Sequence, residues 1–272
     1  MTTGPLTKLV NAAFCWPKNR KFAEDEPHDK CGVRVFVLQH APCDLPSVFN
    51  DREVYVPIQC GRALHETIEG AVGDDTGENI SNRNAEINEM TAIWWVGKHL
   101  DELGDFQYVG FSHYRRWLSW SPRVLGHDVV LACKVVQWQS LRRFFGRLHS
   151  FAALELYEKE FRREFGDDEA RLFARYLDGF VFYPCNCFLM GRDQFKRYRV
   201  FIDKCVAIAL KLIDSDALGL DRMTPYQRRM FGFILERVTS YWIWREKRLG
   251  AIKVVGCEIK EFNIANRANS IR

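Results

Sequence analysis

A dense polar cluster follows a short apolar segment near the middle of the chain, and its residue types suit anion binding. Residues 108–111 have the pattern of a buried strand and lead directly to His113, Tyr114, Arg115 and Arg116. Two adjacent guanidinium groups form a fork that can hold a carboxylate or a phosphate through paired hydrogen bonds. Because open α/β sheets bind ligands at the carboxyl ends of their strands, the cluster predicts an anion site at such an edge. The alternative is a surface strand end whose arginines pair with nearby acidic side chains.

A glycine-rich acidic loop at residues 70–79 is a second candidate. Gly73 and Gly77 are interspersed with short polar residues, so backbone N–H groups of the loop can approach a ligand closely. Asp74 and Asp75 also offer carboxylates, which hard divalent cations prefer. The alternative is a solvated turn that caps the helix following it.

Two further patterns lie in the second half of the chain. Arg228, Gly232 and Glu236 are four residues apart, so on one helix they would share a face. A glycine inside a helix costs about 1 kcal/mol relative to alanine, which indicates close approach by a ligand or by another segment. A plain Arg–Glu helix pair is the alternative. Asn186 lies in the strand-like segment 180–190, and a buried amide needs a partner such as a sugar hydroxyl or backbone.

Strands and helices alternate around these residues. We expect strands near 33–39, 54–58, 107–112, 128–133, 180–190 and 251–255, and helices near 81–103, 192–214 and 225–247, with Ser81 as the N-cap of the first helix. The charged, helical segment at about 136–178 is interpreted as an insertion, and residues 1–31 as an N-terminal extension. The alternation predicts a single α/β domain over residues 1–272.

Composition excludes several classes of protein. The chain has 272 residues, of which 47% are hydrophobic and 27% are charged, as in globular proteins. A net charge of +4 is small for a general nucleic-acid binder. Apolar runs fall far short of the roughly 20 residues that span a bilayer. No secretion signal is visible, so we expect a cytoplasmic protein.

The cysteine and histidine spacing raises the question of a zinc site. His28 and Cys31 precede the expected strand 33–39, and His40 and Cys43 follow it. A strand of that length separates the two pairs by about 20 Å. Because the ligands of one zinc ion lie within about 2.0–2.3 Å of the metal, we expect no zinc site here.

Taken in order, these motifs resemble a bacterial glycan-synthesis family from capsule and O-antigen gene clusters, whose members are galactofuranosyltransferases. The resemblance covers roughly residues 33–245 and departs from the family pattern at Met90, Trp94 and residues 97–99. The matching positions are His40, Pro57-Ile58, residues 73–81, Glu89-Met90-Thr91, Trp94-Trp95, residues 110–116, Asn186 and residues 229–237.

The resemblance implies a fold like that of the GT-A glycosyltransferases, with a central mixed sheet flanked by helices. It implies transfer of a hexose with inversion, with UDP-galactofuranose as the expected donor and a glycan or lipid-linked oligosaccharide as the acceptor. Where GT-A enzymes carry an Asp-x-Asp metal motif, this chain has residues 113–116. We therefore expect cationic side chains to neutralise the diphosphate without a required metal or other cofactor. Peripheral association with the inner face of the membrane is left open.

The expected roles follow from this resemblance and from the chemistry of transfer. A carboxylate must accept the proton of the acceptor hydroxyl, and Glu236 is the first candidate, followed by Asp75. Alternative functions are transfer of another nucleotide-activated sugar and non-catalytic binding of RNA or a phosphoglycan. The expected donor-binding residues are His40, Asp74, Asn79, Ser81, Asn84, Glu89, His113, Arg115 and Arg116, and the acceptor- or sugar-binding residues are Asn186, Arg229 and Arg237.

Overall fold

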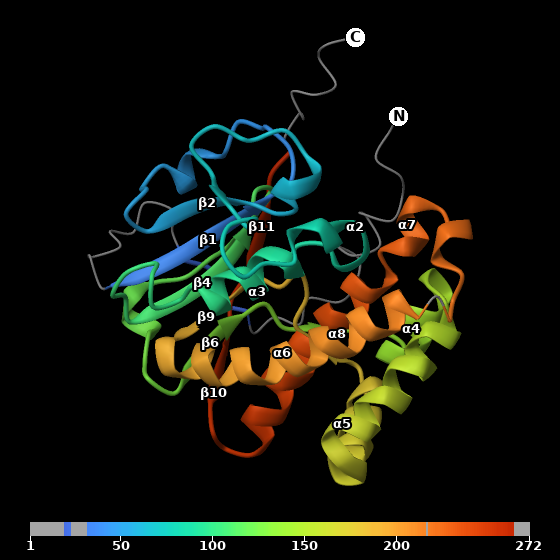
Figure 1. Cartoon of the computed structure of the whole chain (residues 1–272). Coiled ribbons are helices and arrows are strands. Elements are labelled where there is room, and N and C mark those ends of the chain that lie inside the picture. The colour runs from blue at the N-terminus through green and yellow to red at the C-terminus, as the bar shows by residue number, and fades with distance from the viewer. Residues whose placement is uncertain (1–18, 23–31, 216, 264–272) are drawn as a thin grey trace.

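A mostly parallel sheet runs through the centre of the molecule, with helices packed against it (Figure 1). The computed structural model describes residues 19–22, 32–215 and 217–263. In spatial order the main strands are β10 (Lys253–Gly256), β6 (Val129–Ala132), β9 (Phe188–Gly191), β4 (Tyr108–His113), β1 (Val33–Gln39), β2 (Tyr55–Gln59) and β3 (Val72–Gly73). The mixed α/β fold with a central sheet, predicted from the sequence, is confirmed.

The direction of the strands brings three of their carboxyl ends together. β1 runs parallel to both of its neighbours, and Val35 lies opposite Tyr55 of β2 and Gly110 of β4. β9 is antiparallel to β4 and β6, while β6 is parallel to β10. Side chains that follow β1, β2 and β4 therefore meet at one edge of the sheet.

Shorter strands extend this framework. β5 (Arg116–Leu118) turns back from β4 and pairs with β11 (Ile259–Glu261), a strand that the sequence did not predict. β7 (Val135–Val136) and β8 (Val181–Phe182) form a separate two-stranded sheet.

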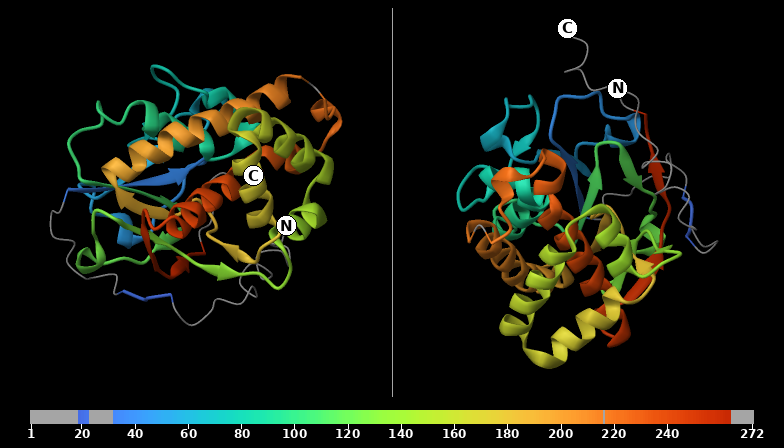
Figure 2. Two further views of the ribbon diagram at one scale, coloured as in Figure 1. Left: turned by 90° about the horizontal axis from the view of Figure 1, so that it is seen from below. Right: turned by 90° about the vertical axis from the view of Figure 1, so that its right-hand side faces the viewer.

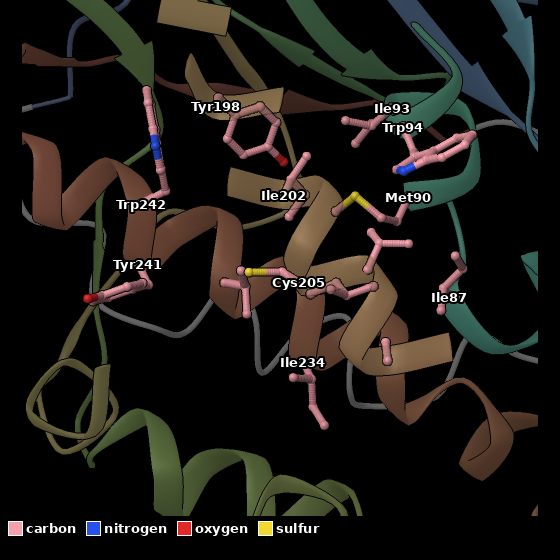
Figure 3. Packing of buried hydrophobic residues seen from close by; sticks show 14 of the residues in the cluster. Ile87, Met90, Ile93, Trp94, Tyr198, Ile202, Cys205, Ile234, Tyr241 and Trp242 are labelled. Carbon is pink, nitrogen blue, oxygen red and sulfur yellow. The ribbon is translucent and has the colours of Figure 1, made fainter. Parts of the chain in front are cut away.

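The two faces of β1 serve different hydrophobic cores, as expected from the alternation of side chains along a strand. Phe36 and Leu38 belong to the core under the helices, whereas Val35 and Val37 belong to a second core with Trp117 and other aromatic residues. Figure 3 shows the first core, where α2 (Asn84–Ile87) and α3 (Met90–Lys98) pack near α6 (Arg192–Asp214) and α8 (Met230–Arg248). These contacts fix α2, α3 and α8 beside the strand ends.

The predicted helical segment at 136–178 contains α4 (Leu141–Leu148) and α5 (Phe151–Leu177), and lies between β7 and β8 in the chain. α5 is interrupted at Gly166, whose φ is 84°. Both helices extend away from the sheet at one end of the molecule (Figures 1 and 2). We call α4, α5 and the β7–β8 pair the helical lobe.

Three predicted elements are interrupted where the backbone leaves its regular conformation. The helix predicted at 81–103 is wrong: after a 3-10 turn at Ser81–Arg83, α2 and α3 are separated at Asn88, whose φ of 55° is not helical. The helix predicted at 225–247 divides at Arg229 into α7 (Pro225–Arg228) and α8. The segment 180–190 is not one strand, because Cys185 and Asn186 have positive φ between β8 and β9.

Other predicted elements hold. Strand 33–39 and helix 192–214 are confirmed with the bounds of β1 and α6. Of the N-terminal extension, only 19–22 is described, and the Arg20 N–H donates to the Gly256 carbonyl. His28 and Cys31 lie outside the described residues. Within the described ranges, none of the helices has the length and apolarity needed to cross a bilayer.

Candidate functional site

Two adjoining cavities lie at the carboxyl ends of β1, β2 and β4. The first, here called the edge cavity, has a volume of about 420 Å³ and is bordered by the strand ends and α2. The second, the lobe cavity, has a volume of about 330 Å³ and lies between the strand ends, the helical lobe and α8. The cavities share part of their lining, so they form one continuous cleft; the shared residues are Asn88, Glu89, His113, Arg115 and Arg229.

The strand ends bring histidine and arginine side chains to the edge cavity. His40 follows β1, and His113 ends β4, where it lies opposite Arg116 across a tight reversal. That reversal exposes Arg115, which borders both cavities. Arg229, at the break between α7 and α8, supplies a second guanidinium to the same space.

The two adjacent arginines do not form the predicted fork. The Nε of Arg116 donates to Glu261 of β11 at 2.8 Å. Arg116 borders the lobe cavity but not the edge cavity. Arg115 has no ion-pair partner among the described residues, and its guanidinium lies 5.8 Å from the ring centre of Tyr114. The edge cavity therefore combines Arg115 with Arg229 rather than with Arg116.

His113 is held as a neutral imidazole. Burial lowers its pKa well below the usual value, and the positive charges of Arg116 and Arg115 lower it further. Its Nδ1 is buried and has no hydrogen-bond partner within the described part of the chain. His113 can therefore exchange hydrogen bonds with a ligand, but it does not add a positive charge at neutral pH.

Glu89 stands at the junction of the two cavities, one residue before α3. The amide nitrogen of Asn186 donates to its Oε1 at 2.9 Å. Asn186 is buried and adopts a φ of 49°, which Asn tolerates better than most residues. Asn186 borders neither cavity, and its amide contacts Glu89 instead.

Glu236 reaches the lobe cavity from α8. The backbone N–H of Cys185 donates to its Oε1 at 2.5 Å, so the turn before β9 fixes the carboxylate. Burial raises the pKa of Glu236 above its usual value, with Arg237 acting in the opposite direction. A carboxylate with a raised pKa is a stronger base than an exposed one, which suits proton acceptance.

The neighbouring Arg237 is enclosed by aromatic rings. Its guanidinium lies 5.0 Å from the ring centre of Phe145 and 5.4 Å from that of Phe182, and it donates to the Phe233 carbonyl at 2.8 Å. Its Nε is buried without a partner among the described residues.

Close contact between α8 and α2 explains the glycine inside α8. A Cβ atom at Gly232 would lie 2.2 Å from the amide nitrogen of Asn88. The prediction of close approach by another segment is therefore confirmed, although Arg228 lies on α7 and does not share the α8 face with Glu236. The Oδ1 of Asn88 accepts from the Nε of Arg229 at 2.5 Å. Asn88 was not predicted, and its sequence signal is the tolerance of Asn for positive φ.

The structure does not bring the acidic loop to the cleft. Asp74 is buried and accepts from the N–H groups of Gly61 and Arg62 and from the Ser81 hydroxyl. Asp75 forms an ion pair with Arg62 at 2.6 Å. Asn79 is exposed and bonds within its own turn. Asp74, Asp75, Asn79 and Ser81 border neither cavity, whereas Asn84 lines the edge cavity.

The described residues contain no group of three or more His, Cys, Asp or Glu side chains arranged to hold a metal ion. Of the carboxylates expected to act, Glu89 borders both cavities and Glu236 the lobe cavity. Nothing in the cleft lining therefore forms an acidic pair at the edge cavity.

Aromatic residues of the lobe cavity were also missed. They come from α4 and the residue after it, β8, α7 and α8, and only tertiary contacts bring them together. They are Phe144, His149, Phe182, Tyr226 and Phe233.

The chain matches a family model described as a domain of unknown function (DUF4422) over residues 34–247. Its fold is similar to the solved apo structure of WbbM, described as a bifunctional glycosyltransferase, with a TM-score of 0.68 and 20% identity. That match covers 86% of this chain and 46% of WbbM, so the chain spans less than half the length of that protein. Identity at this level establishes a common fold. A sequence search of curated proteins gives no significant match.

Proposed function

This chain belongs to the family described as a domain of unknown function (DUF4422), and on that premise we propose that it is a glycosyltransferase that uses a nucleotide-diphosphate sugar. The fold it has in common with WbbM, a bifunctional glycosyltransferase, supports the reaction class. The location of the cleft adds support, because ligands of open α/β sheets bind beyond the carboxyl ends of the strands.

The observation that carries the proposal is the continuity of two chemically different cavities. The edge cavity presents Arg115 and Arg229, which suit a diphosphate. The lobe cavity presents aromatic rings, which suit the C–H face of a sugar, and the Glu236 carboxylate, which suits the proton of a sugar hydroxyl. Transfer requires the diphosphate site and the sugar site to lie next to each other. Glu89 and His113 border both cavities and mark the place where the two sites meet.

In the proposed reaction the acceptor hydroxyl oxygen attacks the anomeric carbon of the donor while the bond to the diphosphate breaks. Glu236 takes the hydroxyl proton, and the nucleoside diphosphate leaves with the bonding electrons. Attack from the face opposite the leaving group inverts the anomeric centre. Arg115 and Arg229 stabilise the charge that develops on the diphosphate. Asp75, the second candidate base, is paired with Arg62 outside the cleft, so we assign the proton to Glu236 alone.

We propose UDP-galactofuranose as the donor and a glycan hydroxyl as the acceptor. The support is the resemblance of residues 73–81, 110–116 and 229–237 to the galactofuranosyltransferase pattern. His40, Asn84 and His113 line the edge cavity and would contact the nucleotide and sugar. Asp74 and Ser81 would act by fixing the loop that supports Gly61 and Arg62.

A panel of nucleotide sugars tests the proposal. The chain is heated with UDP-galactofuranose, UDP-galactopyranose, UDP-glucose and GDP-mannose, because a ligand that binds the native state raises the melting temperature. UDP release with added glycan fragments then reports turnover. We expect the largest stabilisation and release with UDP-galactofuranose. A preference for a pyranose donor would overturn only the donor assignment, and no response to any nucleotide sugar would contradict the glycosyltransferase proposal.

A further inference from the structure

Three rings at the lobe cavity pack against one another, and the reaction described above gives none of them an individual role. His149 stacks on Phe233 with ring centres 4.3 Å apart and planes inclined by 22°. Tyr226 stacks on His149 at 5.5 Å and 29°. We call Tyr226, His149 and Phe233 the aromatic shelf; all three border the lobe cavity.

The shelf is not closed off inside the core. Tyr226 borders the cavity and is 44% exposed. Its neighbour Phe233 is partly exposed, and His149 is buried beneath the two. An accessible aromatic surface in a cavity next to a fixed carboxylate resembles the apolar wall of a small-ligand site.

Unpartnered polar atoms accompany these rings. The Nδ1 of His149 and the Nε of Arg237 are both buried and have no hydrogen-bond partner within the described residues. Burial, reinforced by the charge of Arg237, lowers the pKa of His149 to about 3, so its imidazole is neutral at physiological pH. Buried polar groups without partners are costly unless a ligand or water satisfies them.

This combination suits one class of ligand. A sugar ring has a face of C–H groups that packs against aromatic rings and an edge of hydroxyls that hydrogen-bonds to polar groups. The shelf offers the first surface, and Glu236, Arg237 and His149 offer the second. Four arginines also border this cavity: Arg115 and Arg229 are shared with the edge cavity, Arg116 pairs with Glu261, and Arg237 lies among aromatic rings. The guanidinium groups suited to a phosphate therefore lie on the side of the edge cavity, whereas the shelf and Glu236 border the lobe cavity alone.

We infer that the aromatic shelf is the acceptor subsite, which binds a neutral sugar ring by stacking and directs one of its hydroxyls toward Glu236. The inference rests on the proposed function for the direction of transfer. The shelf itself would bind the sugar whether or not a donor is present.

Ligand-observed saturation-transfer NMR tests the shelf with the full chain and methyl glycosides of galactose, glucose and mannose. Stacking should transfer most saturation to ring C–H protons on one face of the bound glycoside. Tyr226→Leu and Phe233→Leu should each weaken glycoside binding by about fivefold to tenfold, since the ring is lost but apolar volume is kept. Phe180→Leu is the matched control: Phe180 is a 50% exposed aromatic residue next to β8 and does not border the cavity.

UDP titration of the same samples separates this inference from the proposed function. We expect UDP affinity to be unchanged in all three variants and UDP not to displace the glycoside. Equal glycoside binding in wild type and Phe233→Leu, displacement by UDP, or no binding of any glycoside would overturn the shelf assignment. If the shelf binds glycosides while no nucleotide sugar binds or turns over, the proposed function fails and the sugar site stands.

Discussion

Adjacent arginines in this chain have different surroundings, and the difference comes from the reversal between β4 and β5. Arg116 is directed to Glu261 of β11, which forms an ion pair with it. Arg115 occupies the exposed turn and borders both cavities. At the residue scale, therefore, Arg115 and the distant Arg229 are the pair that can hold an anion.

Arg115→Lys tests that pairing. Lysine keeps the positive charge but loses the planar fork, so UDP affinity should fall by about 1–3 kcal/mol. Because Arg115 is exposed, the melting temperature should not change. Calorimetric titration of UDP gives the affinity. Arg143→Lys, at an exposed site on α4 outside the cleft, is the control and should bind UDP like wild type. Unchanged UDP affinity in Arg115→Lys would show that this side chain does not hold the diphosphate.

Glu236→Gln should abolish transfer while leaving donor binding nearly intact. Loss of a general base lowers turnover by roughly 10²–10⁴-fold, and glutamine can still accept the hydrogen bond from the Cys185 N–H. Single-turnover transfer at saturating donor isolates the chemical step. Retention of more than about a tenth of the wild-type rate is incompatible with a general base on this scale.

The same substitution should change stability in a pH-dependent way. Because burial raises the pKa of Glu236, the native state binds its proton more tightly than the unfolded chain does. The free energy of unfolding of the wild type therefore falls as pH rises from the ordinary carboxyl pKa of 4.5 through the raised pKa, and stays lower above it. Glu236→Gln removes this penalty, so it should melt higher than wild type at about pH 7.5 and lose that advantage below about pH 4.

Melting temperatures of wild type and Glu236→Gln across this pH range measure the effect. Glu155→Gln, at an exposed position on α5, is the matched control and should follow wild type at every pH. A difference between Glu236→Gln and wild type that is independent of pH would mean that the titration of Glu236 is not its cause.

At the scale of elements, the sequence predicted those whose local pattern agrees with their tertiary surroundings. β1 and α6 are uniformly regular, and their bounds were predicted correctly. The breaks at Asn88 and Arg229 were not, because apolar periodicity continues on both sides of each break. The break at Asn88 lies where α8 packs closely, because Gly232 of α8 lies against Asn88. Such a constraint comes from residues 144 positions away, and no local pattern contains it.

Some residues of the candidate site could be predicted from the sequence and others could not. His40, His113 and Arg115 lie at strand ends, and parallel pairing brings strand ends together, so their grouping could be predicted. Asp74 and Ser81 were predicted to bind a ligand because they are polar. The structure shows that these polar groups hydrogen-bond to each other and to backbone groups instead. Residue type alone does not separate a side chain that binds a ligand from one that holds a loop.

The departure from the family pattern at residues 97–99 also concerns an element rather than the cleft. Gly97 approaches Arg199, which donates to its carbonyl at 2.9 Å, and His99 bonds to Glu102 and to the Glu78 carbonyl. Neither Gly97 nor His99 borders the two cavities. Within the described structure, these residues lie where α3 ends and packs on α6.

Gly232→Ala tests whether the contact between α2 and α8 shapes the edge cavity. The added methyl group must displace the Asn88 side chain, which bonds to Arg229. Overpacking of this kind costs about 1–3 kcal/mol and outweighs the gain in helix propensity of about 1 kcal/mol. We expect a lower melting temperature and weaker UDP binding. Gly146→Ala in α4 is the control, because its methyl group would meet the exposed ring of Phe151, which can move.

Thermal melting and UDP titration of both glycine variants give the result. Gly146→Ala should be as stable as wild type or more stable, with unchanged UDP affinity. Normal UDP binding in a destabilised Gly232→Ala would show that the α2–α8 contact serves stability and does not position Arg229.

At the scale of the whole molecule, one cleft joins the sheet to the helical lobe. The strand ends contribute His113 and Arg115, and the helical lobe contributes part of the aromatic wall, together with α7 and α8. The dependence of ligand affinity on salt separates the proposed nucleotide-sugar enzyme from an RNA-binding protein. RNA binding would release many counterions and weaken steeply with salt, whereas two arginines on one diphosphate give a shallow dependence.

The charge of the cleft leads to the final prediction, that UDP binds without an added divalent metal. The edge cavity pairs two guanidinium groups with a single bordering carboxylate, Glu89, which Asn186 already engages. A diphosphate brought there meets cationic partners directly, so chelating trace metal with EDTA should change UDP affinity by less than about threefold. Calorimetric titrations with EDTA, and with excess Mg²⁺ restored, measure this. A loss beyond about tenfold that Mg²⁺ reverses would mean that a cation carries part of the charge, and Glu89→Gln would then be the substitution that tests its ligand.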